Sequence, residues 1–225
     1  MDNAAGVRVA VILPAYREGA RVAAVVTGCL KHVDKVLVVD DFSPDDTSAL
    51  AAAAGAEVVR HDSNRGKGAA LKTGFGHLRS QGFTHAIAMD ADGQHDPERI
   101  PAFIAAAAAT ASGVVLVLGN RFQDVRGMPF VRRHTNRLMS WLISRICRTP
   151  VPDSQCGYRL VRLDNPVLYS AKADHFEYES EVLILTARAG GRIVSVPVPT
   201  TYGDEQSKIR PWVDTQRFLR LLLRL

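Results

Sequence analysis

Three side chains that carry oxygen atoms occupy alternate positions in the run Asp90-Ala91-Asp92-Gly93-Gln94, directly after the apolar stretch His85 to Met89. Side chains two residues apart on an extended segment point in the same direction, so Asp90, Asp92 and Gln94 could bind one cation together. Such hard oxygen ligands suit Mg²⁺ or Mn²⁺, which usually keep open positions for a phosphate-bearing substrate. An acidic turn with solvated carboxylates is the alternative, and the short pattern alone does not choose between them.

The elements that must position these residues are apolar runs of strand length, separated by Ala-rich or amphipathic stretches of helical length. This alternation predicts an α/β fold. Because hydrophobicity within the runs is nearly continuous, we expect a mostly parallel sheet covered on both faces by helices. The runs are Val7 to Leu13, Lys35 to Val39, Ala56 to Arg60, His85 to Met89 and Val114 to Leu118, and after Arg121 no further run of this kind is expected before Arg192 to Val198.

Polar clusters follow four of these runs. In open α/β sheets the ligand crevice lies outside the carboxyl ends of the strands, so we expect the clusters to converge on one site. If they are merely the polar beginnings of loops, the repeated carboxylates have no explanation. The clusters are Pro14-Ala15-Tyr16-Arg17-Glu18, Asp40-Asp41, Asp90-Ala91-Asp92 and Gly119-Asn120-Arg121.

Length and composition predict one globular domain, residues 1–225. Because the alternation of strands and helices stops after Arg121, the second half (122–225) is interpreted as an acceptor-side elaboration on a nucleotide-binding half (1–121). A net charge of +5 indicates an anionic partner. Nucleic acid is not expected, because the basic residues flank apolar faces and lack interleaved aromatics. Three cysteines in no zinc-binding pattern, with no secretory signal, predict a reducing, cytoplasmic setting. The apolar runs are shorter than the roughly 20 residues of a membrane span.

The segment Asn64-Arg65-Gly66-Lys67-Gly68 precedes a predicted helix from Ala69 to Arg79. Backbone N–H groups at the start of a helix, together with the charge of Lys67, can bind an anion. Alternatively, the two glycines only shape a tight turn between a strand and a helix.

Two helical stretches combine basic and apolar faces. Such surfaces suit a lipid phosphate or a membrane interface. The first could equally be an ordinary amphipathic helix with a solvated basic face, and the second could pack against the domain or a second subunit. In the first, which runs to about Cys147, one face carries Arg133, Arg137, Ser140 and Ser144 and another carries Leu138, Met139, Leu142, Ile143 and Ile146; in the second, Phe218, Leu221, Leu222 and Leu225 oppose Arg217, Arg220 and Arg224.

Taken in order along nearly the whole chain, these motifs resemble the glycosyltransferase family 2 enzymes of the GT-A fold, a Rossmann-like nucleotide-binding fold, and within them the dolichol-phosphate mannose synthase group. One departure is Phe42, where the family commonly has Gly in a turn that uses the conformational freedom of glycine. The motifs are Leu13 to Glu18, Val38 to Thr47, Asn64 to Leu71, Asp90 to Pro97, Gly119 to Arg121, Asp153 to Arg159 and Ser207 to Ile209.

The resemblance implies roles for individual residues. Asp90, Asp92 and Gln94 would bind the metal ion, while Asp90, Asp92, Arg121 and Asp153 would form the catalytic group. Ser207 and Lys208 would belong to a loop that closes over the donor, although a plain surface loop fits these residues too. The implied donor-binding residues are Pro14, Ala15, Tyr16, Glu18, Asp40, Asp41, Lys67, Asp90, Ala91, Asp92 and Lys208.

The expected function is inverting, metal-dependent transfer of a hexose from a nucleotide sugar to a polyprenyl phosphate, dolichyl or undecaprenyl. Mannose from GDP-mannose is the first expectation, and UDP-glucose is the alternative donor. Arg121, Arg133 and Arg137 would bind the acceptor phosphate, which is ionised near neutrality and needs no general base. A saccharide hydroxyl would need one, and Asp153 is then the candidate.

A noncatalytic module that binds nucleotide or membrane is the third possibility. For transfer to a polyprenyl phosphate we expect peripheral contact with the cytoplasmic face of a membrane, through the terminal helix or through a membrane-protein partner, whereas an enzyme that acts on a saccharide hydroxyl should be indifferent to lipid.

Overall fold

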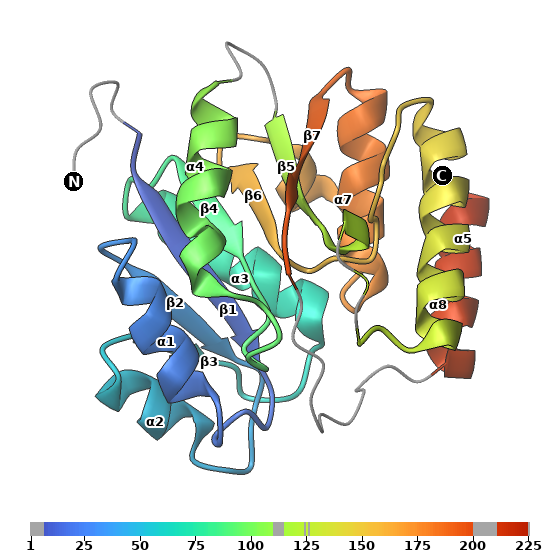
Figure 1. The fold of residues 1–225 in the computed structure, drawn as a ribbon. Helices are drawn as coiled ribbons and strands as arrows, with labels where there is room; N and C mark the ends of the chain where they lie inside the picture. Colours follow the sequence, from blue (N-terminus) through green and yellow to red (C-terminus); the bar gives the residue numbers. More distant parts are fainter. Residues whose placement is uncertain (1–6, 110–114, 124, 126, 200–210, 225) are drawn as a thin grey trace.

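The computed structural model of the chain describes residues 7–109, 115–123, 125, 127–199 and 211–224. Within these residues, seven strands form one sheet in the order β3-β2-β1-β4-β6-β5-β7 (Figure 1). β6 pairs antiparallel with β4 and β5, whereas the other neighbouring strands are parallel. The strands are β1 (Val9–Ala15), β2 (Val36–Asp40), β3 (Glu57–Arg60), β4 (His85–Ala88), β5 (Val115–Asn120), β6 (Arg159–Arg162) and β7 (Arg192–Pro197).

Helices cover both faces of this sheet. Alternate residues of β1 point to opposite faces, so that Val11 and Leu13 join one apolar cluster and Ala10 and Ile12 join the other. The first cluster is closed by α1 (Val22–Leu30), α2 (Thr47–Ala53) and α4 (Ile100–Ala108), and the second by α3 (Lys67–Ser80), α5 (Phe130–Cys147), α6 (Val167–Ser170), α7 (Glu177–Arg188) and α8 (Pro211–Arg224). Two short 3₁₀ turns, η1 (Pro97–Arg99) and η2 (Arg121–Gln123), follow β4 and β5.

The expected α/β class and mostly parallel sheet are confirmed, but one strand was missed. No strand was expected between Arg121 and Arg192, and yet β6 lies inside the sheet between β4 and β5. It has only four residues, Arg159 to Arg162, with an arginine at each end. Its apolar pattern is therefore too short to be recognised, and β6 is placed by its pairing with β4 and β5.

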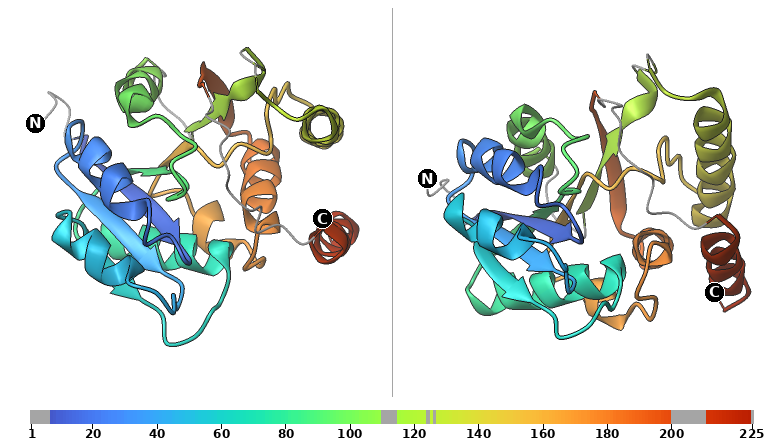
Figure 2. Two further views of the ribbon diagram at one scale, coloured as in Figure 1. Left: turned by 60° about the horizontal axis from the view of Figure 1, so that its bottom comes forward. Right: turned by 90° about the horizontal axis from the view of Figure 1, so that it is seen from below.

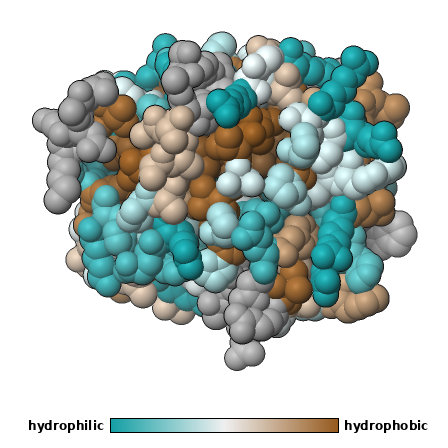
Figure 3. All heavy atoms as spheres, turned by 45° about the horizontal axis from the view of Figure 1, so that its top comes forward, coloured by the Kyte–Doolittle hydropathy of each residue, from teal (hydrophilic) through white to brown (hydrophobic). Residues whose placement is uncertain are grey.

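The carboxyl ends of β1, β2, β4 and β5 lie at the same edge of the sheet. β5 runs in the direction of β4 because both pair antiparallel with β6. Figure 2, in its right-hand view from below, looks onto this edge. Figure 3 is turned so that the top of Figure 1, which lies opposite this edge, comes forward. In that view apolar side chains gather between hydrophilic ones. The polar clusters that follow the four strands thus share one end of the molecule.

Helix α8 lies beyond α7 at one side of the molecule, next to α5 (Figures 1 and 2). Phe218 and Leu221 are buried in the core, and Arg224 Nη2 lies 2.7 Å from Glu181 Oε1 of α7. Leu219 and Leu223 are exposed. The sequence left open whether the apolar face of this helix meets a membrane or packs against protein. In the structure, the buried part of that face packs against the domain.

Helix α5 buries most of the predicted apolar face, because Ile143 is buried and Met139, Leu142 and Ile146 pack against the core, but it also buries part of the predicted basic face. Asn136, Ser140, Ile143 and Cys147 are buried, whereas Leu138 is 63% exposed. Ser140 Oγ accepts a hydrogen bond of 2.9 Å from the Ser154 backbone N–H, which explains why a serine faces inward. The expected apolar face is therefore wrong at Leu138, and the expected solvated face is wrong at Ser140. None of the described helices is long and apolar enough to span a membrane.

Candidate active site

Asp90 is held beside a lysine at the end of β4. Lys67 Nζ, at the start of α3, lies 2.6 Å from Asp90 Oδ1 and 2.8 Å from Glu179 Oε2 of α7. Burial, the largest single effect, raises the pKa of Asp90, but the charge and hydrogen bond of Lys67 together with other nearby positive charge outweigh it and bring the pKa to about 2. Burial lowers the pKa of Lys67, and the charges of Asp90 and Glu179 raise it above its ordinary value. Both groups are therefore ionised at neutral pH.

Gly157 leaves the space that this ion pair occupies. A Cβ atom on Gly157 would lie 2.5 Å from Asp90 Oδ2 and 2.9 Å from Lys67 Nζ. Arg159 anchors the same segment from β6: its Nη1 donates to the Glu179 carbonyl oxygen at 2.6 Å, and its Nη2 donates to the Ser154 carbonyl oxygen at 2.8 Å. No site role was predicted for Glu179 or Arg159; the only signal for Arg159 was its place in the motif that ends at this residue.

Asp92 and Gln94 follow Asp90 at the same strand end. The Gln94 backbone N–H donates to Asp92 Oδ1 at 2.9 Å. Burial, and then the charge of Asp90, raise the pKa of Asp92 to about 6. The charge of Glu18, from the end of β1, acts in the same direction. Carboxylates from two strand ends therefore repel one another here, which is a place that favours a cation.

The donor set fits a hard divalent cation through two carboxylates and one amide. Among the described residues, no three His, Cys, Asp or Glu side chains cluster so that they could hold a metal ion. Binding by Asp90 and Asp92 therefore needs a further oxygen, for which Gln94 stays the predicted source. Residues 91 and 92 form a turn and Gly93 has a φ of 78°, so the run is not the extended segment from which the shared direction of the three side chains was predicted. Such a set leaves coordination positions open for phosphate oxygens.

His95 is a third site residue to which the sequence pattern assigned no role. It is buried, and its Nε2 lies 3.8 Å from Asp90 Oδ2. Burial lowers the pKa of His95 to about 4, so the imidazole is neutral at physiological pH. The ring packs against Tyr158, with 5.3 Å between the ring centroids. His95 therefore forms part of the wall against which Asp90 is placed.

Arg121 and Asp153 form a buried ion pair at the end of β5. Arg121 Nε lies 2.7 Å from Asp153 Oδ2, and Nη2 lies 2.9 Å from Oδ1, so the guanidinium and the carboxylate meet through two parallel hydrogen bonds. Arg121 is 3% exposed and Asp153 is fully buried. The charge of Arg121 also lowers the pKa of Asp90, which places the β5 end near the β4 end.

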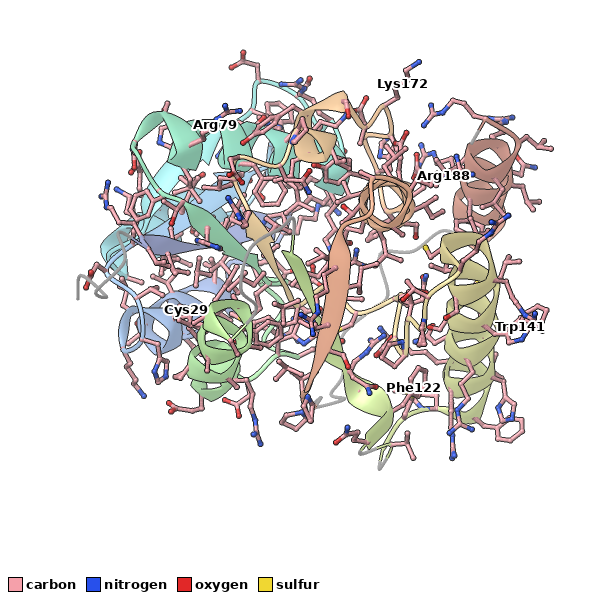
Figure 4. All side chains as sticks on the ribbon, turned by 90° about the horizontal axis from the view of Figure 1, so that it is seen from above. Cys29, Arg79, Phe122, Trp141, Lys172 and Arg188 are labelled. Carbon is pink, nitrogen blue, oxygen red and sulfur yellow. The ribbon has the colours of Figure 1, made fainter. Side chains whose placement is uncertain are left out.

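The other two predicted phosphate-binding arginines lie on α5. The Arg137 guanidinium carbon is 5.5 Å from the ring centroid of Phe122, the residue after Arg121, and Arg137 is exposed. Phe122 belongs to the 3₁₀ turn η2 that follows β5, where Figure 4 labels it. Arg133 is partly buried, and its Nε has no hydrogen-bond partner among the described residues. The structure thus brings Arg137 to the β5 end through Phe122.

Asp40 and Asp41 are buried and hold the backbone around them. Asp40 Oδ1 accepts from the Ser43 N–H at 2.8 Å. Asp41 accepts from the backbone N–H groups of Arg65 at 2.8 Å and of Gly66 at 2.7 Å. These hydrogen bonds fix the turn that delivers Lys67 to Asp90.

The glycine of that turn has a structural role. Gly66 has a φ of +97°, and a Cβ atom there would lie 2.6 Å from the Asp174 carbonyl oxygen. Only glycine fits such a backbone without strain. For Gly66 the structure supports the tight-turn alternative, whereas Lys67 next to it points into the site.

The remaining predicted donor-binding residues lie along the same edge. Ala15 pairs with Asp40 in the sheet, and Tyr16 and Glu18 follow it directly. The Glu18 N–H donates to Thr47 Oγ1 at 2.9 Å. Ala91 is buried between the two carboxylates of the β4 end, and Pro14 is partly buried in β1. Ser207 and Lys208 lie outside the described residues.

Comparison with known proteins gives a consistent result. Residues 10–165 match the family described as glycosyl transferase family 2. An undecaprenyl-phosphate mannosyltransferase of Micrococcus luteus is 34% identical, over 85% of this chain and 82% of its own length. A polyprenol monophosphomannose synthase of Mycolicibacterium smegmatis is 30% identical, over 86% of this chain and 77% of its own length.

The fold is also similar to that of a solved protein. Glucosyl-3-phosphoglycerate synthase of Mycobacterium tuberculosis, crystallised with UDP, superposes with a TM-score of 0.78 at 23% identity, over 98% of this chain and 80% of that one. At this identity the likeness concerns the fold, which confirms the expected GT-A architecture.

Proposed function

Because this chain belongs to glycosyl transferase family 2, we propose that it transfers a hexose from a nucleotide sugar to a polyprenyl phosphate. The observation that carries this proposal is the group formed by Asp90, Asp92 and Lys67 at one strand end, with Arg121 nearby. Mannose from GDP-mannose is the first donor to test, because two relatives are named as mannosyl-transferring enzymes. UDP-glucose is the second.

On the donor side, we assign Pro14, Ala15, Tyr16 and Glu18 to the wall that receives the base and ribose. Asp40 and Asp41 act mainly through the backbone they hold, because their carboxylates already accept internal hydrogen bonds. Ala91 leaves room for the diphosphate beside the metal-binding carboxylates. Ser207 and Lys208 are proposed to close over the bound donor and so limit hydrolysis of the sugar nucleotide.

Departure of the nucleoside diphosphate is the step that needs most help, since negative charge builds on the β-phosphate. Mg²⁺ or Mn²⁺ held by Asp90, Asp92 and Gln94 would supply a Lewis acid there. Lys67 adds a fixed positive charge within 2.6 Å of the same carboxylate. Gly157 leaves the space that the Asp90 carboxylate occupies, and His95 lies next to that carboxylate, so both help to hold Asp90 in place.

On the acceptor side, a lipid phosphate attacks the anomeric carbon in line with the departing diphosphate, which inverts the configuration. Arg121, Arg133 and Arg137 would orient that phosphate. No general base is required, because a phosphate monoester is largely ionised near neutrality. Asp153 is fully buried and bonded to two nitrogens of Arg121, which supports a positioning role and disfavours Asp153 as base for a saccharide hydroxyl.

The outer helices support peripheral contact with a membrane. On α5, Trp141 is 57% and Phe130 74% exposed, and on α8, Leu223 is 89% exposed. Figure 4 shows Trp141 directed away from the sheet. The Arg145 guanidinium lies 5.5 Å from the Trp141 ring centroid, so positive charge accompanies the exposed apolar groups. This combination suits an interface with anionic headgroups.

The direct test is a transfer assay with purified protein, Mn²⁺ or Mg²⁺, radiolabelled GDP-mannose or UDP-glucose, and undecaprenyl or dolichyl phosphate in detergent. We expect a labelled glycolipid that requires the metal and the lipid phosphate. Asp90→Asn is expected to reduce the rate by about a hundredfold or more, because it removes a ligand that stabilises developing charge. The lipid alcohol without phosphate should not accept sugar.

Failure to glycosylate any polyprenyl phosphate with any nucleotide sugar would contradict the proposal. Transfer to a soluble saccharide that is lost in Asp153→Asn, with donor binding intact, would instead favour the hydroxyl acceptor. Nucleotide binding without turnover on any acceptor would favour a noncatalytic module.

A further inference from the structure

Two bulky residues adopt left-handed backbone conformations at the adjoining ends of β1 and β2. Arg17 has a φ of 57° and Phe42 a φ of 66°. The two turns are tied together, because the Arg17 N–H donates to Ser43 Oγ at 3.0 Å and the Asp41 N–H donates to the Ala15 carbonyl oxygen at 2.8 Å. This backbone region is unfavourable for an aromatic residue, and glycine adopts it freely. Strained residues of this kind concentrate at ligand-binding positions.

Core packing does not account for Phe42. Its side chain is 48% exposed, although it directly follows the buried pair Asp40 and Asp41. The Arg60 guanidinium carbon lies 5.8 Å from the Phe42 ring centroid. Arg60 is itself held by Asp40 Oδ2 at 3.2 Å and by the Ser43 carbonyl oxygen at 2.7 Å. The exposed ring of Phe42 therefore lies on a hydrogen-bonded turn, next to the positive charge of Arg60.

We infer that Phe42 is a contact for the nucleobase of the donor, an inference that rests on the proposed function. The ring stands at the carboxyl end of β2, one strand from the end of β1 that carries Tyr16. Every nucleobase has a π-face that an aromatic side chain can stack on, whatever its hydrogen-bonding edge. Phe42 therefore adds affinity for the base moiety in general and leaves the choice between guanine and uracil to other groups.

The test is calorimetric titration of the Phe42→Gly variant with GDP, UDP and inorganic pyrophosphate in the presence of Mn²⁺. We expect the Kd for both nucleotides to rise about tenfold, which corresponds to the loss of one base–aromatic stack. The Kd for pyrophosphate, which has no base, should stay within about twofold. Glycine is comfortable at this φ, so the midpoint of thermal unfolding should not fall.

Two further variants make the result specific. Arg148→Gly places glycine at another left-handed position, with a φ of 52° after α5, and should leave nucleotide Kd unchanged. Phe42→Tyr keeps a ring and should bind nucleotides within about threefold of the parent protein, since a stack depends on the ring.

Two outcomes would overturn the inference in distinguishable ways. If the parent protein binds GDP or UDP and Phe42→Gly binds them equally well, Phe42 is not a base contact and the proposed function stands. If Phe42→Gly weakens pyrophosphate as much as GDP, the substitution has disturbed the phosphate site and the base contact is rejected. If the parent protein binds neither nucleotide, the proposed function itself fails.

Discussion

At the scale of single residues, Lys67 links the most distant parts of the site. Its ammonium pairs with Asp90 from β4 and with Glu179 from α7, and its side chain is 14% exposed. The positive charge therefore balances two carboxylates that are largely withdrawn from water. Removing it leaves both of them without their counter-ion, which is the costly way to break a buried ion pair.

Lys67→Met is accordingly expected to lower the free energy of unfolding by about 3 kcal/mol. The matched control is Lys72→Met in the same helix, because Lys72 pairs with Asp174, whose side chain is 55% exposed. An exposed pair of this kind contributes at most about 1 kcal/mol. Urea denaturation of both variants measures the difference, and equal losses would show that the Lys67 pairing is no more stabilising than a surface pair.

Glu57 gives a prediction of pH dependence. The hydrogen bond from Lys35 lowers the pKa of Glu57 most, burial opposes it, and His77 and Gln81 add to the lowering, which takes the value from 4.5 to about 2. A carboxyl group whose pKa is lower in the folded state than in the unfolded state stabilises the fold when the pH lies above its unfolded-state pKa. This stabilisation is lost as the pH falls from 4.5 towards 2.

Glu57→Gln should therefore reduce stability at pH 7 by about 1 kcal/mol, and the gap between parent and variant should narrow below pH 4.5. Thermal unfolding at a series of pH values from neutral to acidic measures the gap. Glu98→Gln, whose side chain is 61% exposed, is the control and should show little change at any pH. A gap that stays constant with pH would rule out the ionised Glu57 as its source.

At the scale of elements, the attachment of α8 depends on a few side chains. Leu221 is 2% exposed and lies in the core cluster, whereas Leu223, two positions later, is 89% exposed. Arg224 adds an ion pair with Glu181, whose Oε2 also accepts from the backbone N–H groups of Lys172 and Ala173. The helix is thus fixed to α7 and to the loop before it.

Leu221→Ala should cost about 2 to 3 kcal/mol of unfolding free energy, because it creates a cavity in the core. Leu223→Ala should change it by less than about 0.5 kcal/mol, since an exposed leucine fills no cavity. Guanidinium denaturation compares the two variants. Equal effects would mean that α8 is not packed as the structure describes.

Between sequence and structure, the elements differ in how far they could be predicted. The buried parallel strands were recognisable because burial on both faces requires continuous apolar runs. β6 was not, because its pairing with β4 and β5 replaces any pattern of its own. The burial of Ser140 on α5 was also unpredictable, since this serine faces inward to accept a hydrogen bond from the Ser154 backbone N–H.

At the scale of the whole molecule, helices α5 and α8, which carry exposed apolar residues, lie on one side, beyond α7 (Figure 1). If this side meets a membrane, vesicle binding should require both apolar and positive groups. The double substitution Trp141→Ser with Leu223→Ser is expected to lower binding to vesicles that contain phosphatidylglycerol by about fivefold or more. Higher salt should weaken binding of the parent protein.

Vesicle sedimentation measures how strongly each variant binds to vesicles. Leu50→Ser on α2 is the control, because Leu50 is an exposed leucine in the helical layer on the other face of the sheet. If the control loses as much binding as the double variant, the membrane contact is not located on α5 and α8. Thermal unfolding of each variant checks that the fold is kept.

The candidate site shows the same division between local and long-range information. Strand length and the order of the motifs are local properties, so the α/β class and the convergence of strand ends could be predicted from the chain alone. Asp90, Asp92 and Gln94 as a ligand set stays a prediction. Contacts between distant segments could not. The pairing of Lys67 with Glu179, the enclosure of Asp153 by Arg121 and the close approach of Gly157 to Asp90 join residues far apart in the sequence. Such contacts depend on how the helices pack on the sheet, because only packing sets the distance and burial that make two charges a pair.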